Sequence, residues 1–219
     1  DIDILFLTPY KTTAWTENVI ESMLYILWDL KLQIGHATRS IDECILLGGK
    51  DFTIRTSLLE TRPICGDKNL GDELTNRLWN ELFQTSTTEF ITAKLKERAT
   101  RHKKHGENRY LLEPNIKEGK GGLRDLQSLF WIAKYIHHVE KPVELIQKGV
   151  FNDQEYSKFV NASNFLWQVR CHLHFINNKA SEQLNFDSQF EIAKRLSYQD
   201  LDGRLAVEHF MQDYFKHAT

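Results

Sequence analysis

Strand-like patterning is confined to the first third of this chain, and that boundary limits the possible folds more than any other feature. Residues 1–7 (DIDILFL) are mostly apolar, β-branched and aromatic, and residues 31–39 (KLQIGHATR) form a second short alternating run. After Gly66 the apolar residues recur almost entirely at helical spacing. The sequence therefore predicts an α+β fold, mostly α overall, in which a few strands precede an all-helical part.

Helices are expected in both parts. In the first part the helices are expected at 16–30, 40–47 and 51–60. Thr16, Ser40 and Asp51 are their expected N-terminal caps. Gly48-Gly49 is expected to end the helix at 40–47. The second part shows six helical stretches and one weak strand pattern at 110–112; the helices are 70–84, 88–105, 123–138, 153–178, 187–197 and 203–217. This change of character predicts two domains, 1–68 and 69–219.

Composition excludes several classes of protein. The 219 residues carry a formal net charge of −2, which argues against a general nucleic-acid or membrane binder. No run of 18 apolar residues is present, so a membrane span is not expected. The three cysteines are odd in number and lack CxxC spacing, which predicts a reducing, cytoplasmic location rather than a disulfide framework.

Two acidic residues lie at the start of the first strand. Alternate residues of a strand share a face, about 6.5–7 Å apart, so Asp1 and Asp3 share one face, and Ile2, Ile4 and Phe6 share the expected core face. Neighbouring carboxylates repel unless water or a divalent cation separates them, and their hard oxygens suit magnesium or manganese held with substrate phosphates. The pattern leaves open a solvated strand edge and a metal site.

A glycine-rich loop leads into the helix expected at 123–138. In the segment EPNIKEGKGGLRDLQ, glycines would let the backbone approach a ligand, and Lys117, Lys120 and Arg124 would add positive charge for a phosphate. The loop matches neither a P-loop nor a dinucleotide-binding fingerprint. The residue types favour a tight turn in which Arg124 and Asp125 form structural salt bridges.

The stretch from Lys94 to Arg124 is basic, with ten Lys or Arg residues against four acidic ones. Such a local field would attract a nucleoside triphosphate. The common alternative is the solvated face of a helical bundle.

Six segments, in this order, resemble one family: DIDILFL, LWDLKLQIGHATRSIDEC, TSLLETRPICGD, RYLLEPNIKEGKGGLRDLQSLFWIAKY, FLWQVRCHLHF and VEHFMQDYF. Together they resemble the bacterial PII uridylyltransferase/uridylyl-removing enzymes over nearly the whole chain. The GGLRD and LQIGH segments are more specific than the acidic pair.

This resemblance implies a partial nucleotidyltransferase domain of the DNA-polymerase-β type in 1–68 and a helical domain in 69–219. It implies transfer of UMP from UTP to a tyrosine of the PII signalling protein, with release of pyrophosphate. The family's D-x-D falls on Asp1 and Asp3, as magnesium ligands. The glycine turn that precedes this pair in the family is not part of the sequence. We therefore expect a piece of a longer protein that is inactive alone.

The resemblance also assigns supporting residues. Polymerase-β-type enzymes usually carry a third carboxylate on a neighbouring strand, but KLQIGHATR contains no acid, so Glu60 is the substitute. Arg39, Lys117, Lys120 and Arg124 are the candidates for binding phosphate or supporting the fold.

Two other functions stay open. GKGGLRD also resembles a loop of glutamine synthetase adenylyltransferases, so adenylyl transfer to a metabolic enzyme is one alternative. A non-catalytic helical interaction module is the other. The expected partners are the PII protein and a nucleoside triphosphate, with neither nucleic acid nor membrane.

Overall fold

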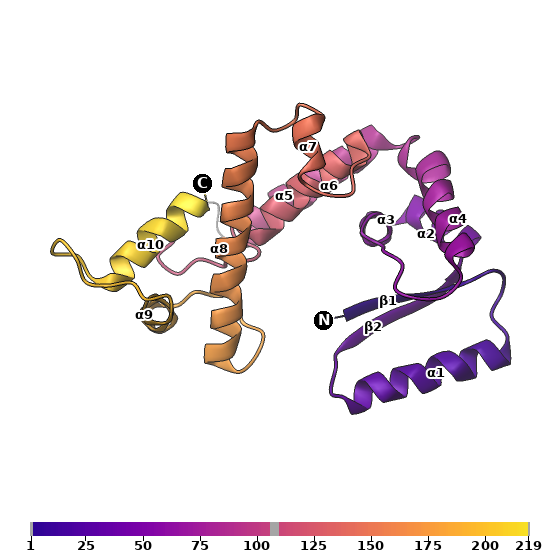
Figure 1. Cartoon of the computed structure of the whole chain (residues 1–219), viewed down its shortest axis with the longest axis horizontal. Helices are drawn as coiled ribbons and strands as arrows, with labels where there is room; N and C mark the ends of the chain where they lie inside the picture. Colours follow the sequence, from indigo (N-terminus) through magenta and orange to yellow (C-terminus); the bar gives the residue numbers. More distant parts are fainter. Residues whose placement is uncertain (1, 106–109, 219) are drawn as a thin grey trace. The chain divides into compact units, whose positions relative to one another are not determined.

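The computed structural model describes residues 2–105 and 110–218, and the chain forms two compact units, Asp1–Thr88 and Glu89–Thr219 (Figure 1). Over the described residues, two strands are present, β1 (Ile2–Thr8) and β2 (Ile34–Ser40), and both lie in the first unit. The expected α+β class, mostly α with few strands, is confirmed. The two units divide at residue 88, whereas a domain boundary at 68 stays a prediction from the sequence.

The strands pair in parallel, from Ile2 with Ile34 to Thr8 with Ser40. Parallel neighbours need a crossover connection, and α1 (Ala14–Asp29) supplies it. The expected cap of this helix is wrong by one turn. Thr13 has the extended backbone of a cap, and its side chain accepts a hydrogen bond from the Thr16 N–H at 3.3 Å.

Ser40 and Asp51 cap α2 (Ile41–Lys50) and α3 (Phe52–Leu59), as the sequence predicts. The expected end of α2 at Gly48 is wrong, because the helix continues to Lys50. A Cβ at Gly48 would lie 2.8 Å from Leu82, so this glycine allows close packing instead of ending the helix. The buried Arg55 guanidinium donates to the Gly48 and Gly49 carbonyls at 2.7 and 2.9 Å and so satisfies the end of α2.

The helix expected at 70–84 forms as two pieces, α4 (Lys68–Arg77) and the π-helix η1 (Leu78–Phe83). Leu74, Leu78 and Leu82 are buried and complete the core of the first unit. Arg77 joins the two pieces to α2 through ion pairs of 2.6 Å to Glu81 and 2.7 Å to Asp42.

The second unit is helical. Its helices are α5 (Thr87–His105), which begins in the first unit, α6 (Leu123–His137), α7 (Glu144–Gln147), α8 (Asp153–Asn177), α9 (Phe186–Arg195) and α10 (Ala206–His217). Its core gathers around α8, α9 and α10 and includes Leu166, Ile192 and Phe210. Residues 110–112 form no strand, so the weak strand predicted there is wrong. The sequence pattern does not predict α7, because a four-residue helix is too short to show a periodic pattern of apolar residues.

Among the described residues, none of the helices combines the length and the apolar character that crossing a bilayer requires.

Candidate functional site

Asp3 lies on the face of the β1–β2 pair that α1 does not cover. In the register, Asp3 pairs with Gly35 and Ile4 pairs with His36. The His36 ring lies against Trp28 of α1, with centroids 6.2 Å apart, so α1 covers the face of Ile4. The Asp3 side chain points to the other face, is exposed, and has no hydrogen bond or ion pair with any described residue. Its two carboxylate oxygens are hard metal ligands, of the kind that magnesium and manganese prefer.

The other two carboxylates assigned to a metal stay predictions. Asp1 lies outside the described residues. Glu60 is exposed at the C-terminal cap of α3. Over residues 2–105 and 110–218, no three His, Cys, Asp or Glu side chains gather in a way that would hold a metal ion.

Arg39 lies on the same sheet face as Asp3. It pairs with Leu7, and positions 35, 37 and 39 alternate onto the face that carries Asp3. Arg39 lies four residue steps along the strand from Gly35, which is about 13 Å at the usual rise of about 3.3 Å per residue. Arg39 is therefore placed beyond Asp3 along the same sheet face, where it is half-buried, and its contact with phosphate stays a prediction.

The glycine-rich loop is a tight turn closed by its own backbone. The Asn115 side chain accepts hydrogen bonds from the N–H groups of Lys117 and Glu118 at 3.1 and 2.7 Å. Gly121 has a φ of +81° and lies directly against the Ala218 carbonyl, where no side chain fits. A Cβ at Gly122 would lie 2.7 Å from the Ile116 carbonyl. The glycines thus serve close backbone packing.

Asp125, in the first turn of α6, ties this loop to α5. Its carboxylate accepts hydrogen bonds from the Gly121 N–H at 2.9 Å, from Arg101 at 2.5 Å and from His102 at 2.9 Å. Arg98, which lies on α5 with Arg101 and His102, places its Nε 3.4 Å from Oδ1 of Asp125. The Asp125 side chain is 11% exposed, so these are largely buried charge-assisted bonds.

The surroundings of Asp125 set its titration. Burial raises its pKa, but the Gly121 hydrogen bond together with His102 and Arg101 outweighs burial and holds the pKa below its ordinary value. Because the folded pKa lies below the unfolded value of about 3.9, the ionised carboxylate stabilises the fold above that pH. This contribution is lost as the pH falls through the folded pKa.

We expect the unfolding free energy of the wild type to fall more steeply than that of Asp125→Asn below about pH 4. Urea unfolding of both proteins at about pH 7, 4 and 3 measures the difference. The same pH dependence in both proteins would contradict the assignment.

Two of the candidate phosphate-binding residues have an acidic partner inside the protein. Glu118 lies 3.7 Å from Arg124 and 4.0 Å from Lys117. The Arg124 guanidinium also lies over the Trp131 ring, 5.4 Å from its centroid. Lys120 has no ion pair with a described residue and is half-buried. The structure thus brings Lys117 and Arg124 together around Glu118 and leaves Lys120 apart from them.

Sequence reasoning missed the residues of α5 that hold this loop. Lys94 and Arg101 are 4% and 8% exposed, so part of the basic stretch lies inside the protein. These two side chains therefore belong neither to a solvated helix face nor to a surface that attracts a nucleotide from a distance. Lys94 pairs with Glu97 at 2.8 Å and lies over Trp131. The spacing of Arg98, Arg101 and His102, at i, i+3 and i+4, is the signal that indicates their shared helix face.

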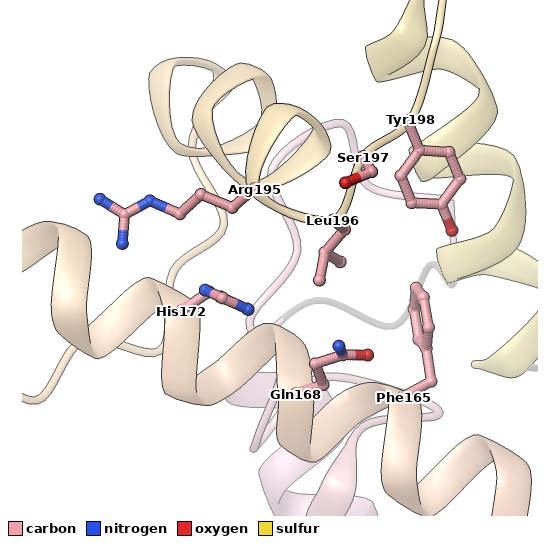
Figure 2. Close-up of a pocket in the computed structure, with 7 residues that line it drawn as sticks. All are labelled: Phe165, Gln168, His172, Arg195, Leu196, Ser197 and Tyr198. Carbon is pink, nitrogen blue, oxygen red and sulfur yellow. The ribbon is translucent and has the colours of Figure 1, made fainter.

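An open cavity of about 390 Å³ lies between α8 and the C-terminal end of α9 (Figure 2). Figure 2 shows Leu196 and Gln168 directed into this space and Arg195 directed away from it. Ser197 has a φ of +61°, because the N–H groups of Ser197 and Tyr198 turn back to carbonyls of the last turn of α9. None of the site residues predicted from the sequence lines this cavity.

Comparison with known proteins connects these features to a family. Residues 89–219, the second compact unit, match the family model described as GlnD PII-uridylyltransferase. No solved structure matches the chain.

Similar curated proteins share one name, "Bifunctional uridylyltransferase/uridylyl-removing enzyme". The protein of Ruegeria pomeroyi is 58% identical over 100% of this chain, and that of Cereibacter sphaeroides is 55% identical over 100%. The protein of Bradyrhizobium sp. (strain ORS 278) is 54% identical over 98% of the chain. The matched region covers 24% of the length of the first two relatives and 23% of the third. The chain therefore belongs to the GlnD PII-uridylyltransferase family.

Proposed function

We propose that this chain is part of an enzyme that transfers UMP from UTP to a tyrosine of the PII signalling protein. The observation that carries the proposal is the match of residues 89–219, one compact unit, to the GlnD PII-uridylyltransferase model. The names of relatives that align with the whole chain favour uridylyl over adenylyl transfer. The resemblance to polymerase-β-type nucleotidyltransferases assigns the chemistry to the first unit.

The reaction is a phosphoryl-group substitution. The tyrosine oxygen attacks the α-phosphorus of UTP in line, the bond from that phosphorus to the bridging oxygen of the β-phosphate breaks, and pyrophosphate leaves. The hydroxyl proton is lost to water. A bound magnesium or manganese ion would offset the charge that develops on the phosphate oxygens. In this chain Asp3 would hold that ion, together with Asp1, and Arg39 would orient the triphosphate from the same sheet face.

In the second unit, Asp125 fixes the loop at Asn115–Gly122, so Lys117 and Arg124 would stabilise the fold around Glu118. The cysteines Cys44, Cys65 and Cys171 are free, which supports a reducing, cytoplasmic location.

Labelling with two donors tests the proposal. Purified full-length protein, PII and magnesium are incubated with α-³²P-labelled UTP or ATP, and the labelled PII residue is identified by mass spectrometry. We expect label from UTP on a tyrosine of PII and none from ATP. In a parallel reaction glutamine synthetase replaces PII. Labelling from ATP, or labelling of glutamine synthetase and not of PII, would identify an adenylyltransferase. Binding of PII without labelling from either donor would indicate an interaction module.

A further inference from the structure

Gly35 is the residue of β2 on which the Asp3 carboxylate rests. The two residues are direct partners in the parallel register. A Cβ at Gly35 would overlap Oδ1 of Asp3 and would lie 3.5 Å from its Cγ and 3.9 Å from the Ile2 carbonyl oxygen. The Asp3 side chain therefore leans across to the neighbouring strand, into the space that a side chain at position 35 would fill.

The backbone itself does not require glycine at position 35. The φ of Gly35 lies outside the left-handed region, and the residue is paired within a regular strand. Glycine weakens a strand, because it loses more conformational freedom on folding and offers no side chain to pack. A strand glycine with ordinary backbone angles is typical of a place that another group approaches closely. Here that group is the carboxylate of Asp3.

We propose that Gly35 is a positioning residue that fixes the orientation of Asp3 for binding a divalent cation, an inference that rests on the proposed function. A methyl group at position 35 would exclude the observed orientation and turn the carboxylate to another rotamer. A ligand must be held within about 0.5 Å of its productive position, so cation affinity would fall. Asp3 is exposed, so the fold would lose little.

Manganese binding tests this in the full-length protein, because electron paramagnetic resonance reports free Mn²⁺ without any need for turnover. We expect Gly35→Ala to weaken the Asp3-dependent binding by about 10-fold, the low end of the effect of groups that orient metal ligands. In an Asp3→Ala background the same substitution should change nothing. Gly49→Ala is the matched control, since a Cβ there meets no atom within 4 Å.

Uridylyl transfer gives a second readout. Gly35→Ala should raise the magnesium concentration for half-maximal activity by a similar factor, about 10-fold, and excess magnesium should restore kcat. A general loss of structure would not be rescued in this way. If Gly35→Ala fails to fold, refolding of the Asp3→Ala/Gly35→Ala double variant would support the steric coupling, and continued failure would overturn it.

The experiment separates the two proposals. Loss of manganese binding and transfer in Asp3→Ala, with wild-type behaviour of Gly35→Ala, would refute the role of Gly35 alone. Unchanged binding and transfer in Asp3→Ala would refute the proposed metal site itself.

Discussion

Asp3→Asn in the full-length protein is expected to reduce uridylyl transfer by about a thousand-fold. A metal ion is worth several kcal/mol of transition-state stabilisation in such reactions, and each ~1.4 kcal/mol corresponds to a factor of ten in rate. The substitution keeps the size of the side chain but removes the charge that would hold the cation. Because Asp3 is exposed and has no partner among the described residues, the fold should be unaffected. The rate of PII labelling from UTP measures the effect.

Asp72→Asn is the matched control, because Asp72 is also exposed in the first unit and lies on α4 instead of the sheet. It should transfer UMP at the wild-type rate. Circular dichroism of both variants checks that the fold is intact. Wild-type turnover of Asp3→Asn with UTP and magnesium would remove Asp3 from the active site.

Asp125→Asn is expected to lower the unfolding free energy by about 3 kcal/mol, the range found when one partner of a buried ion pair is removed. The neutral amide would deprive the buried Arg101 guanidinium of its nearest charged partner, leaving Glu118 at 3.6 Å and Glu97 at 3.9 Å. It would also weaken the bond from the Gly121 N–H and the hydrogen bonds that tie the loop at Asn115–Gly122 to α5. Urea unfolding at neutral pH, followed by circular dichroism, measures the change.

Asp187→Asn is the control in the same unit, because Asp187 is exposed in the first turn of α9. Its effect should stay within about 0.5 kcal/mol, as for most surface substitutions. An Asp125→Asn variant as stable as this control would show that the Asp125 network contributes little to the fold. The glycine loop would then need another explanation.

The sequence predicted most helices well because their signals are local. Ser40 and Asp51 cap their helices as expected, since a cap depends on residues within one turn. Gly48 was misjudged for the opposite reason, because its role depends on Leu82, far along the chain. The same limit applies to the basic stretch. Charge alone could not reveal that Lys94 and Arg101 are buried, because burial depends on which element covers that face.

For the candidate site, the residue pattern by itself predicted that Asp1 and Asp3 share one strand face, and it determined that glycines and charges gather before α6. The tertiary structure alone decided that Asp3 pairs with Gly35, that α1 covers the opposite face, and that Asp125 binds Arg101 and His102. The physical reason is that spacing along a strand or helix follows from local backbone geometry. Register and ion-pair choice arise from contacts between segments that are distant in the sequence.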